Sequence, residues 1–204
     1  MNFPILSSLI LLPTIGAFFL LFTKSRKEND LTIKYVALFT TLVNFFLSIY
    51  LWFLFDQSTS EFQFVENRIW IEGLVNYKVG IDGISILFII LTTFITPLCI
   101  ISVNNSIKTR LREFLIAVLV MESFMIGVFC SLDLVVFYLF FEAGLIPMFL
   151  IIGIWGGPKR VYSAFKFFLY TLLGSVLMLV AIISIYWISG TTDVIKLDEL
   201  GIDV

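Results

Sequence analysis

Long apolar runs separated by short polar stretches dominate the hydrophobicity pattern of this chain. A helix needs roughly 17 to 25 apolar residues to cross about 30 Å of hydrocarbon. Six runs reach that length, and they predict membrane-spanning helices at about 3–23, 33–55, 84–103, 113–132, 134–155 and 162–188. Backbone in lipid must satisfy its own hydrogen bonds, and runs of this length do so as helices. We therefore expect an all-α polytopic membrane protein with a single membrane domain over 1–204.

The first run and the longest polar interval need separate interpretation. The first run begins at Phe3 without a basic segment before it, so it predicts a retained helix rather than a signal peptide. The interval 56–82 mixes aromatic and β-branched residues with turn signals at Glu72-Gly73 and Asp82-Gly83. It predicts either a short hairpin at the interface or an aromatic-anchored loop. The stretch after 188 is a polar, acidic tail.

The distribution of basic residues predicts the orientation of the helices, because cytoplasmic loops of membrane proteins are enriched in Lys and Arg. Three basic residues, Arg68, Lys78 and Lys196, fall on one side. The other ten share the opposite side: Lys24, Arg26, Lys27, Lys34, Lys108, Arg110, Arg112, Lys159, Arg160 and Lys166. Both ends of the chain are thus expected on the outer side, away from the cytoplasm or matrix.

Composition agrees with a bilayer and excludes several functions. The chain is 60% apolar and 14% charged, against about 45–50% and about 25% in soluble domains. A net charge of −2 without a basic tract gives no support for nucleic-acid binding. The absence of histidine excludes bis-His haem and imidazole zinc sites, and the two cysteines cannot hold an iron–sulfur cluster alone. We expect no metal or cofactor here, with any electron carrier on a partner, and no disulfide between Cys99 and Cys130.

Two carboxylates fall inside predicted spans. Glu122 and Glu142 each lie about nine residues from the outer turn at 131–133, so both are roughly 13 Å deep, near the bilayer centre. Charged residues at that depth are costly and usually functional. A tight hairpin of the two helices would be able to bring them together. Both are candidates for proton transfer; the alternative for either is a protonated side chain that only bonds a neighbouring helix.

The residues around each candidate differ. After Glu142 come small residues and Pro147, which frees a backbone carbonyl one turn earlier and predicts a helix kink near the site. The neighbours of Glu122 at one turn are apolar. On the sixth run, Tyr162, Lys166 and Tyr170 recur every four residues, which predicts a polar stripe. Lys166 is therefore a third proton-transfer candidate, but it also lies close enough to the inner end to snorkel to the headgroups.

Three motifs carry a resemblance to a known family. FFE-x-x-x-IP spans 140–147, a WG turn lies at 155–156, and KFFLYT-x-x-G begins at Lys166. Together with the IDG-x-S stretch at 81–85, they closely resemble the antiporter-like subunit M of NADH:quinone oxidoreductase, the counterpart of mitochondrial chain 4. The resemblance covers essentially the whole chain.

The resemblance implies a proton-translocating subunit in the membrane arm of respiratory complex I. It implies that Glu142 works in a buried Glu/Lys axis with a seventh-helix lysine, that Lys166 matches mainly bacterial members, and that Glu122 matches no general pattern. NADH, FMN, iron–sulfur clusters and quinone would be bound by partner subunits, so this chain would belong to an oxidoreductase without performing redox chemistry. The expected partners are other membrane-arm subunits and lipid. The expected location is a bacterial inner membrane or the mitochondrial inner membrane.

The family fold has about fourteen helices, of which this sequence carries six, so we expect a truncated or split N-terminal part. Two other functions stay open. One is a subunit of a multi-subunit monovalent cation/proton antiporter, which shares the ancestry. The other is an assembly fragment that does not pump. The organism, the ion moved and the route of coupling to the redox site are not predicted.

Overall fold

The computed structural model describes residues 4–23, 30–71, 75–103, 107 and 109–201. Within these ranges it contains six helices that are long and apolar enough to cross a membrane, which confirms the predicted fold class. The helices are α1 (Ile5–Phe22), α2 (Asp30–Leu54), α3 (Ser85–Ser102), α4 (Leu111–Cys130), α5 (Leu134–Trp155) and α6 (Arg160–Ser189). Helix α2 begins earlier than predicted because Asp30 occupies its first turn, where a carboxylate is favourable.

Several predicted features lie outside the described residues: Lys24, Arg26, Lys27 and Lys108, and the turn Glu72-Gly73. The orientation of the helices across a membrane therefore stays a prediction. Cys99 and Cys130 are both free, as expected.

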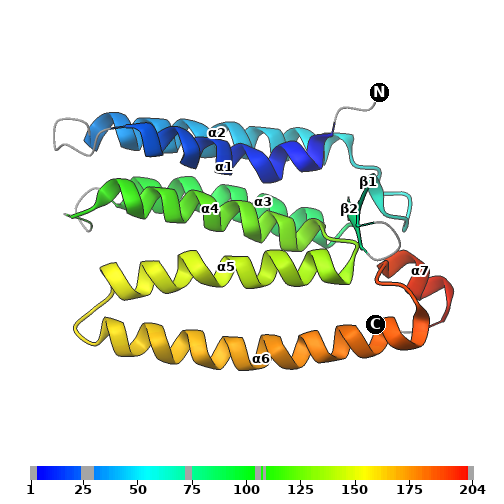
Figure 1. The fold of residues 1–204 in the computed structure, drawn as a ribbon. Helices are drawn as coiled ribbons and strands as arrows, with labels where there is room; N and C mark the ends of the chain where they lie inside the picture. Colours follow the sequence, from blue (N-terminus) through cyan, green and yellow to red (C-terminus); the bar gives the residue numbers. More distant parts are fainter. Residues whose placement is uncertain (1–3, 24–29, 72–74, 104–106, 108, 202–204) are drawn as a thin grey trace.

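The helices form successive layers (Figure 1). Helices α1 and α2 lie beside α3 and α4, α5 packs on α4, and α6 packs on α5. Two apolar clusters fill the space between the first four helices, one around Leu9, Leu51 and Ile126 and one around Leu20, Ile33 and Leu119. Helix α6 is the least buried of the six, since within the described chain only α5 packs along its length.

One end of the bundle carries a β-hairpin, the first of the two structures that the interval 56–82 allowed. Strand β1 (Gln63–Ile71) pairs antiparallel with β2 (Val75–Ile81). Glu66 of β1 accepts hydrogen bonds from the first amides of α1, at 2.9 Å from Leu6 N and 3.3 Å from Ser7 N. A carboxylate there satisfies N–H groups that have no intrahelical partner, so the hairpin is fastened to the bundle.

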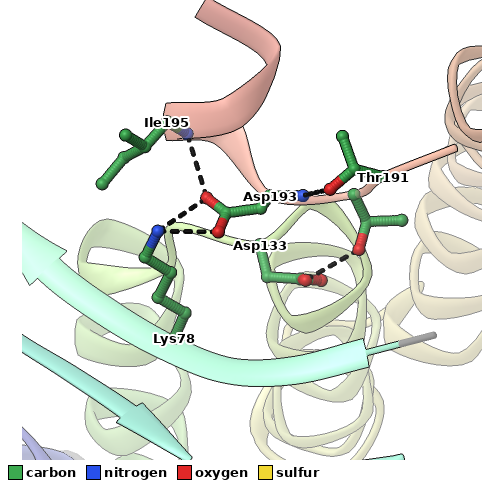
Figure 2. Close-up of polar contacts among 6 residues, drawn as sticks. Lys78, Asp133, Thr191, Asp193 and Ile195 are labelled. Atoms are coloured by element: carbon green, nitrogen blue, oxygen red, sulfur yellow. Dashed lines mark hydrogen bonds and ion pairs between the residues drawn. The ribbon is translucent and has the colours of Figure 1, made fainter. Parts of the chain in front are cut away.

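A buried polar cluster joins the hairpin to the end of the described chain (Figure 2). Lys78 Nζ of β2 lies 2.8 and 2.7 Å from the two carboxylate oxygens of Asp193. Asp133 caps α5 through Val135 N at 2.9 Å and accepts a hydrogen bond from Thr192 Oγ1 at 2.7 Å. We call the four residues Lys78, Asp133, Thr192 and Asp193 the outer clasp, because they lie at the end of the bundle that is expected on the outer side of the membrane.

The acidic tail contains a short helix that the sequence interpretation missed. Helix α7 (Val194–Glu199) follows Asp193, whose carboxylate accepts a hydrogen bond from Ile195 N at 3.1 Å. Asp193 thus serves both as a helix cap and as the partner of Lys78, 115 residues away. The cap residue was visible in the sequence, but the buried cation that orders it was not.

Candidate functional site

Glu142 lies near the middle of α5, about 12 Å from the start of the helix at Leu134. Its Oε2 atom is buried and has no hydrogen-bond partner. Seven residues later, and therefore on the same face, Phe149 packs its ring against Phe165 and Phe168 of α6 at 5.5 and 5.4 Å. The carboxyl group is therefore on the side of α5 that faces α6.

The level of Glu142 along α6 follows from the same contacts. Phe149 of α5 lies opposite Phe168 of α6, and the two helices are antiparallel. Glu142 precedes Phe149 by seven residues, about 10 Å along the helix, so the residue opposite it on α6 is seven residues after Phe168, which is Ser175. Ser175 is 2% exposed, and its hydroxyl donates to Leu172 O at 3.0 Å. Ser175 is thus a buried polar residue of α6 at the depth of Glu142.

Lys166 is not brought to Glu142. It precedes Ser175 by nine residues, two and a half helical turns, so it lies on the opposite side of α6 from α5. Its neighbours in the stripe, Tyr162 and Tyr170, are 67% and 82% exposed. Lys166 is also at the level of Phe149, about 10 Å along the axis from Glu142. In the described chain, the stripe is an exposed face.

Pro147 is buried inside α5, which continues from Leu134 to Trp155 without a break. It follows Phe140 by seven residues, and Phe140 packs against Phe124 and Gly127 of α4. Pro147 therefore shares the α4 side of the helix, while Glu142 lies on the α6 side. The backbone carbonyl that the proline leaves without an intrahelical partner is near Ala143, next to Glu142 in the chain.

Glu122 of α4 occupies a different place. It is 1% exposed, and its Oε1 atom accepts a hydrogen bond of 2.9 Å from Nδ2 of Asn44 on α2, a residue that is fully buried. Sequence reasoning missed Asn44. An amide in the middle of a predicted span was a visible signal, because polar side chains there usually bond a neighbouring helix.

The two glutamates point away from each other. Phe124 faces α5, and Glu122 precedes it by two residues, about 200° around the helix, so Glu122 lies on the far side of α4. Glu142 likewise lies on the far side of α5. The hairpin of α4 and α5 places the two carboxyl groups at similar depths with both helices between them. The bundle therefore contains two separate acids rather than a pair, Glu122 fully buried and Glu142 half-buried.

Neither acid has a cation within hydrogen-bond reach among the described residues, where the two ion pairs are Lys78–Asp193 and Arg112–Glu113. The described residues also contain no group of three His, Cys, Asp or Glu side chains that could hold a metal ion. The arrangement is thus one of two carboxyl groups, without a basic partner among the described residues, inside an apolar bundle.

Comparison with known proteins gives consistent results. Residues 131–202 match the family model described as "NADH:quinone oxidoreductase/Mrp antiporter, TM". Over 173 residues, the chain is 60% identical to NADH-quinone oxidoreductase subunit M of Rhodobacter capsulatus, covering 85% of this chain and 33% of that protein. It is 47% identical over 190 residues to NADH-ubiquinone oxidoreductase chain 4 of Marchantia polymorpha, covering 92% and 38%. The chain therefore spans well under half the length of these curated relatives.

Solved structures share the fold. A chain in respiratory complex I from Thermus thermophilus with bound NADH matches with a TM-score of 0.77 and 28% identity, over 92% of this chain and 38% of that one. A chain of an archaeal membrane-bound sulfane sulfur reductase matches with a TM-score of 0.78 and 19% identity, a likeness of fold alone.

Proposed function

Since this chain corresponds in sequence and fold to the N-terminal part of the antiporter-like subunit M of NADH:quinone oxidoreductase, we propose that it is a proton-translocating part of the membrane arm of that enzyme. The observation that carries the proposal is the buried, unpartnered carboxyl oxygen of Glu142 in the middle of α5. It lies within the stretch that matches the family model. Buried ionisable groups at mid-membrane depth are typical of proton pathways.

The proposed mechanism is electrostatic. A cation that approaches Glu142 stabilises its carboxylate and favours release of the proton; withdrawal of that cation favours uptake. Lys166 faces away from Glu142, so this cation must come from outside the described residues. Lys166 would transfer protons only to or from groups outside the described residues that pack on the exposed face of α6. Glu122 would be a further proton-transfer group, on the other side of α4.

The proposal also assigns partners and location. The chain would pack against other membrane-arm subunits and lipid in a bacterial inner membrane or the mitochondrial inner membrane. NADH oxidation and quinone reduction would take place on partner subunits that hold FMN, iron–sulfur clusters and quinone. This chain would supply proton-binding groups and no redox centre.

A second candidate is a subunit of a multi-subunit cation/proton antiporter, because the matching family model is described for both kinds of protein. The relatives named above, at 60% and 47% identity, are both subunits of NADH dehydrogenases and favour the respiratory enzyme. A part that supports assembly without pumping is a third candidate.

One experiment separates these functions. We expect an epitope tag on this chain, in membranes solubilised with a mild detergent, to migrate on a native gel with NADH dehydrogenase activity. We expect an inhibitor of the quinone site to abolish NADH-dependent acidification in the same membranes. Migration apart from that activity, together with acidification that depends on Na⁺ or K⁺ and resists the inhibitor, would favour the antiporter instead.

A further inference from the structure

The boundary between α2 and α4 holds a carboxyl–amide pair in a fully buried position. Asn44 is 0% exposed and Glu122 is 1% exposed. One hydrogen bond joins them, from Asn44 Nδ2 to Glu122 Oε1 at 2.9 Å. The two remaining oxygens of the pair, Asn44 Oδ1 and Glu122 Oε2, are also buried and accept no hydrogen bond. If the carboxyl group of Glu122 is ionised, both of these oxygens can only accept, and the pair lacks a donor to join them.

Among the described residues, no cation lies close enough to compensate a charge at this place. Helices α1 and α3, which pack against α4, contain no Lys, Arg, Asp or Glu within their bounds. The nearest basic residues on the other two helices are Arg112 of α4 and Lys34 of α2. Each lies ten residues from Glu122 or Asn44, about 15 Å along the helix.

The remaining elements near α4 add no cation either. Glu142 of α5 is turned away toward α6. Lys78 in the hairpin is bound by Asp193. An ionised Glu122 would therefore be an uncompensated buried charge, and such groups become neutral instead.

A proton on the free oxygen of Glu122 solves both problems. It removes the charge, and it turns Oε2 from an acceptor into a donor, which is the group that the pair lacks. A carboxylic acid and a primary amide are complementary in this way: the amide N–H donates to one acid oxygen, and the acid O–H donates to the amide oxygen. The structure shows the first of these two hydrogen bonds.

We propose that Asn44 and Glu122 form a proton-binding site, separate from Glu142, in which Glu122 is held as a neutral acid and the amide oxygen of Asn44 positions its O–H group by accepting a hydrogen bond. This deepens the proposed function, in which Glu122 is one of three candidate groups. The site is on the α2 side of α4, so it exchanges no proton with Glu142 by direct contact.

The surroundings of the pair fit a proton site rather than a packing accident. Thr41 and Ser48 flank Asn44 at one turn on the same face of α2, and both are fully buried. Ser48 continues to α3 through a hydrogen bond of 2.7 Å to the hydroxyl of Thr93. The two hydroxyl groups donate to backbone carbonyls of their own helix, Thr41 to Ala37 O at 3.2 Å and Ser48 to Phe45 O at 2.7 Å, so the face of α2 that carries Asn44 is polar over two turns.

Infrared spectroscopy of the assembled complex tests the proposal without using pumping as a readout. We expect a C=O stretching band of a protonated carboxyl that is lost in Glu122→Gln and moves to lower frequency in D₂O. Glutamine keeps the shape of the side chain and can pair with Asn44 through two amide hydrogen bonds, so the variant should assemble. In Asn44→Leu, the same band should move to higher frequency, because its hydrogen bonds are lost. Ser184→Ala on α6, which removes a hydroxyl group that donates to Val180 O within its own helix, is the control and should leave the band unchanged.

Each result decides the proposal. If wild type and Glu122→Gln do not differ in the protonated-carboxyl region, Glu122 is ionised and the proposal is wrong. If the band is present but unmoved in Asn44→Leu, Asn44 does not position the proton and that part is wrong. If the proposed function is wrong, the native gel and the pumping measurement will show it. The infrared band of Glu122 would be unchanged in that case.

Discussion

Replacing Glu142 with glutamine is expected to reduce proton pumping by the assembled complex on the order of tenfold or more. Glutamine has the shape of glutamate and fits the same place on the α6 side of α5, so assembly should be unchanged. It cannot bind and release a proton, which is the property that the proposed function requires of this group. The measurement is NADH-driven acidification in membrane vesicles, normalised to the amount of assembled complex.

The matched control is Glu113→Gln, which makes the same chemical change near the inner end of α4. Glu113 pairs with Arg112 at 3.3 Å and its side chain is 43% exposed, so its loss should have little effect. Normal pumping by assembled Glu142→Gln complexes would remove Glu142 from the mechanism. An equal loss in both variants would instead indicate a general effect of removing a carboxylate from the helices.

Replacing Lys78 with methionine in the outer clasp is expected to destabilise the chain by about 3–5 kcal/mol. Methionine fills a similar volume but leaves the carboxylate of Asp193 buried without its cation. The hairpin, the start of α5 and α7 meet at this cluster, so all three should loosen together. The measurement is the temperature at which the complex loses this chain in mild detergent, with limited proteolysis near 190–201 as a local readout.

A double replacement shows whether the ion pair is the cause. Lys78→Met combined with Asp193→Asn should recover much of the lost stability, because the buried charge is then removed while asparagine still caps α7. Lys196→Met on the exposed side of α7 is the control, and it should change stability by no more than about 0.5 kcal/mol. A single variant Lys78→Met as stable as the control would show that the clasp contributes nothing.

The depth of each candidate was predictable from sequence, because depth along a helix is a count of residues. The six spans were visible as apolar runs, and counting from the turn at 131–133 placed Glu122 and Glu142 near mid-membrane. Helical spacing also grouped Tyr162, Lys166 and Tyr170 on one face. What it did not give was the direction of that face, which lies opposite to α5.

The direction in which a side chain points within the bundle depends on which helices are neighbours, and that depends on packing between segments far apart in the chain. Asn44 meets Glu122 across 78 residues, and Lys78 meets Asp193 across 115. No local sequence pattern in one segment predicts which distant segment it contacts. The short helix α7 was missed for the same reason, since its cap is ordered by a lysine in the hairpin.

By itself, the sequence determined that the chain crosses a membrane, where its six spanning helices lie and which carboxyl groups are near the middle of them. These follow from the free energy of placing each residue in hydrocarbon, which depends on that residue and its near neighbours. Only the tertiary structure decided that Glu122 and Glu142 face away from each other, that Asn44 bonds Glu122, that Ser175 lies at the depth of Glu142, and that Lys166 faces away from Glu142. Those outcomes depend on how the helices rotate and pack, which is set by contacts summed over the whole bundle.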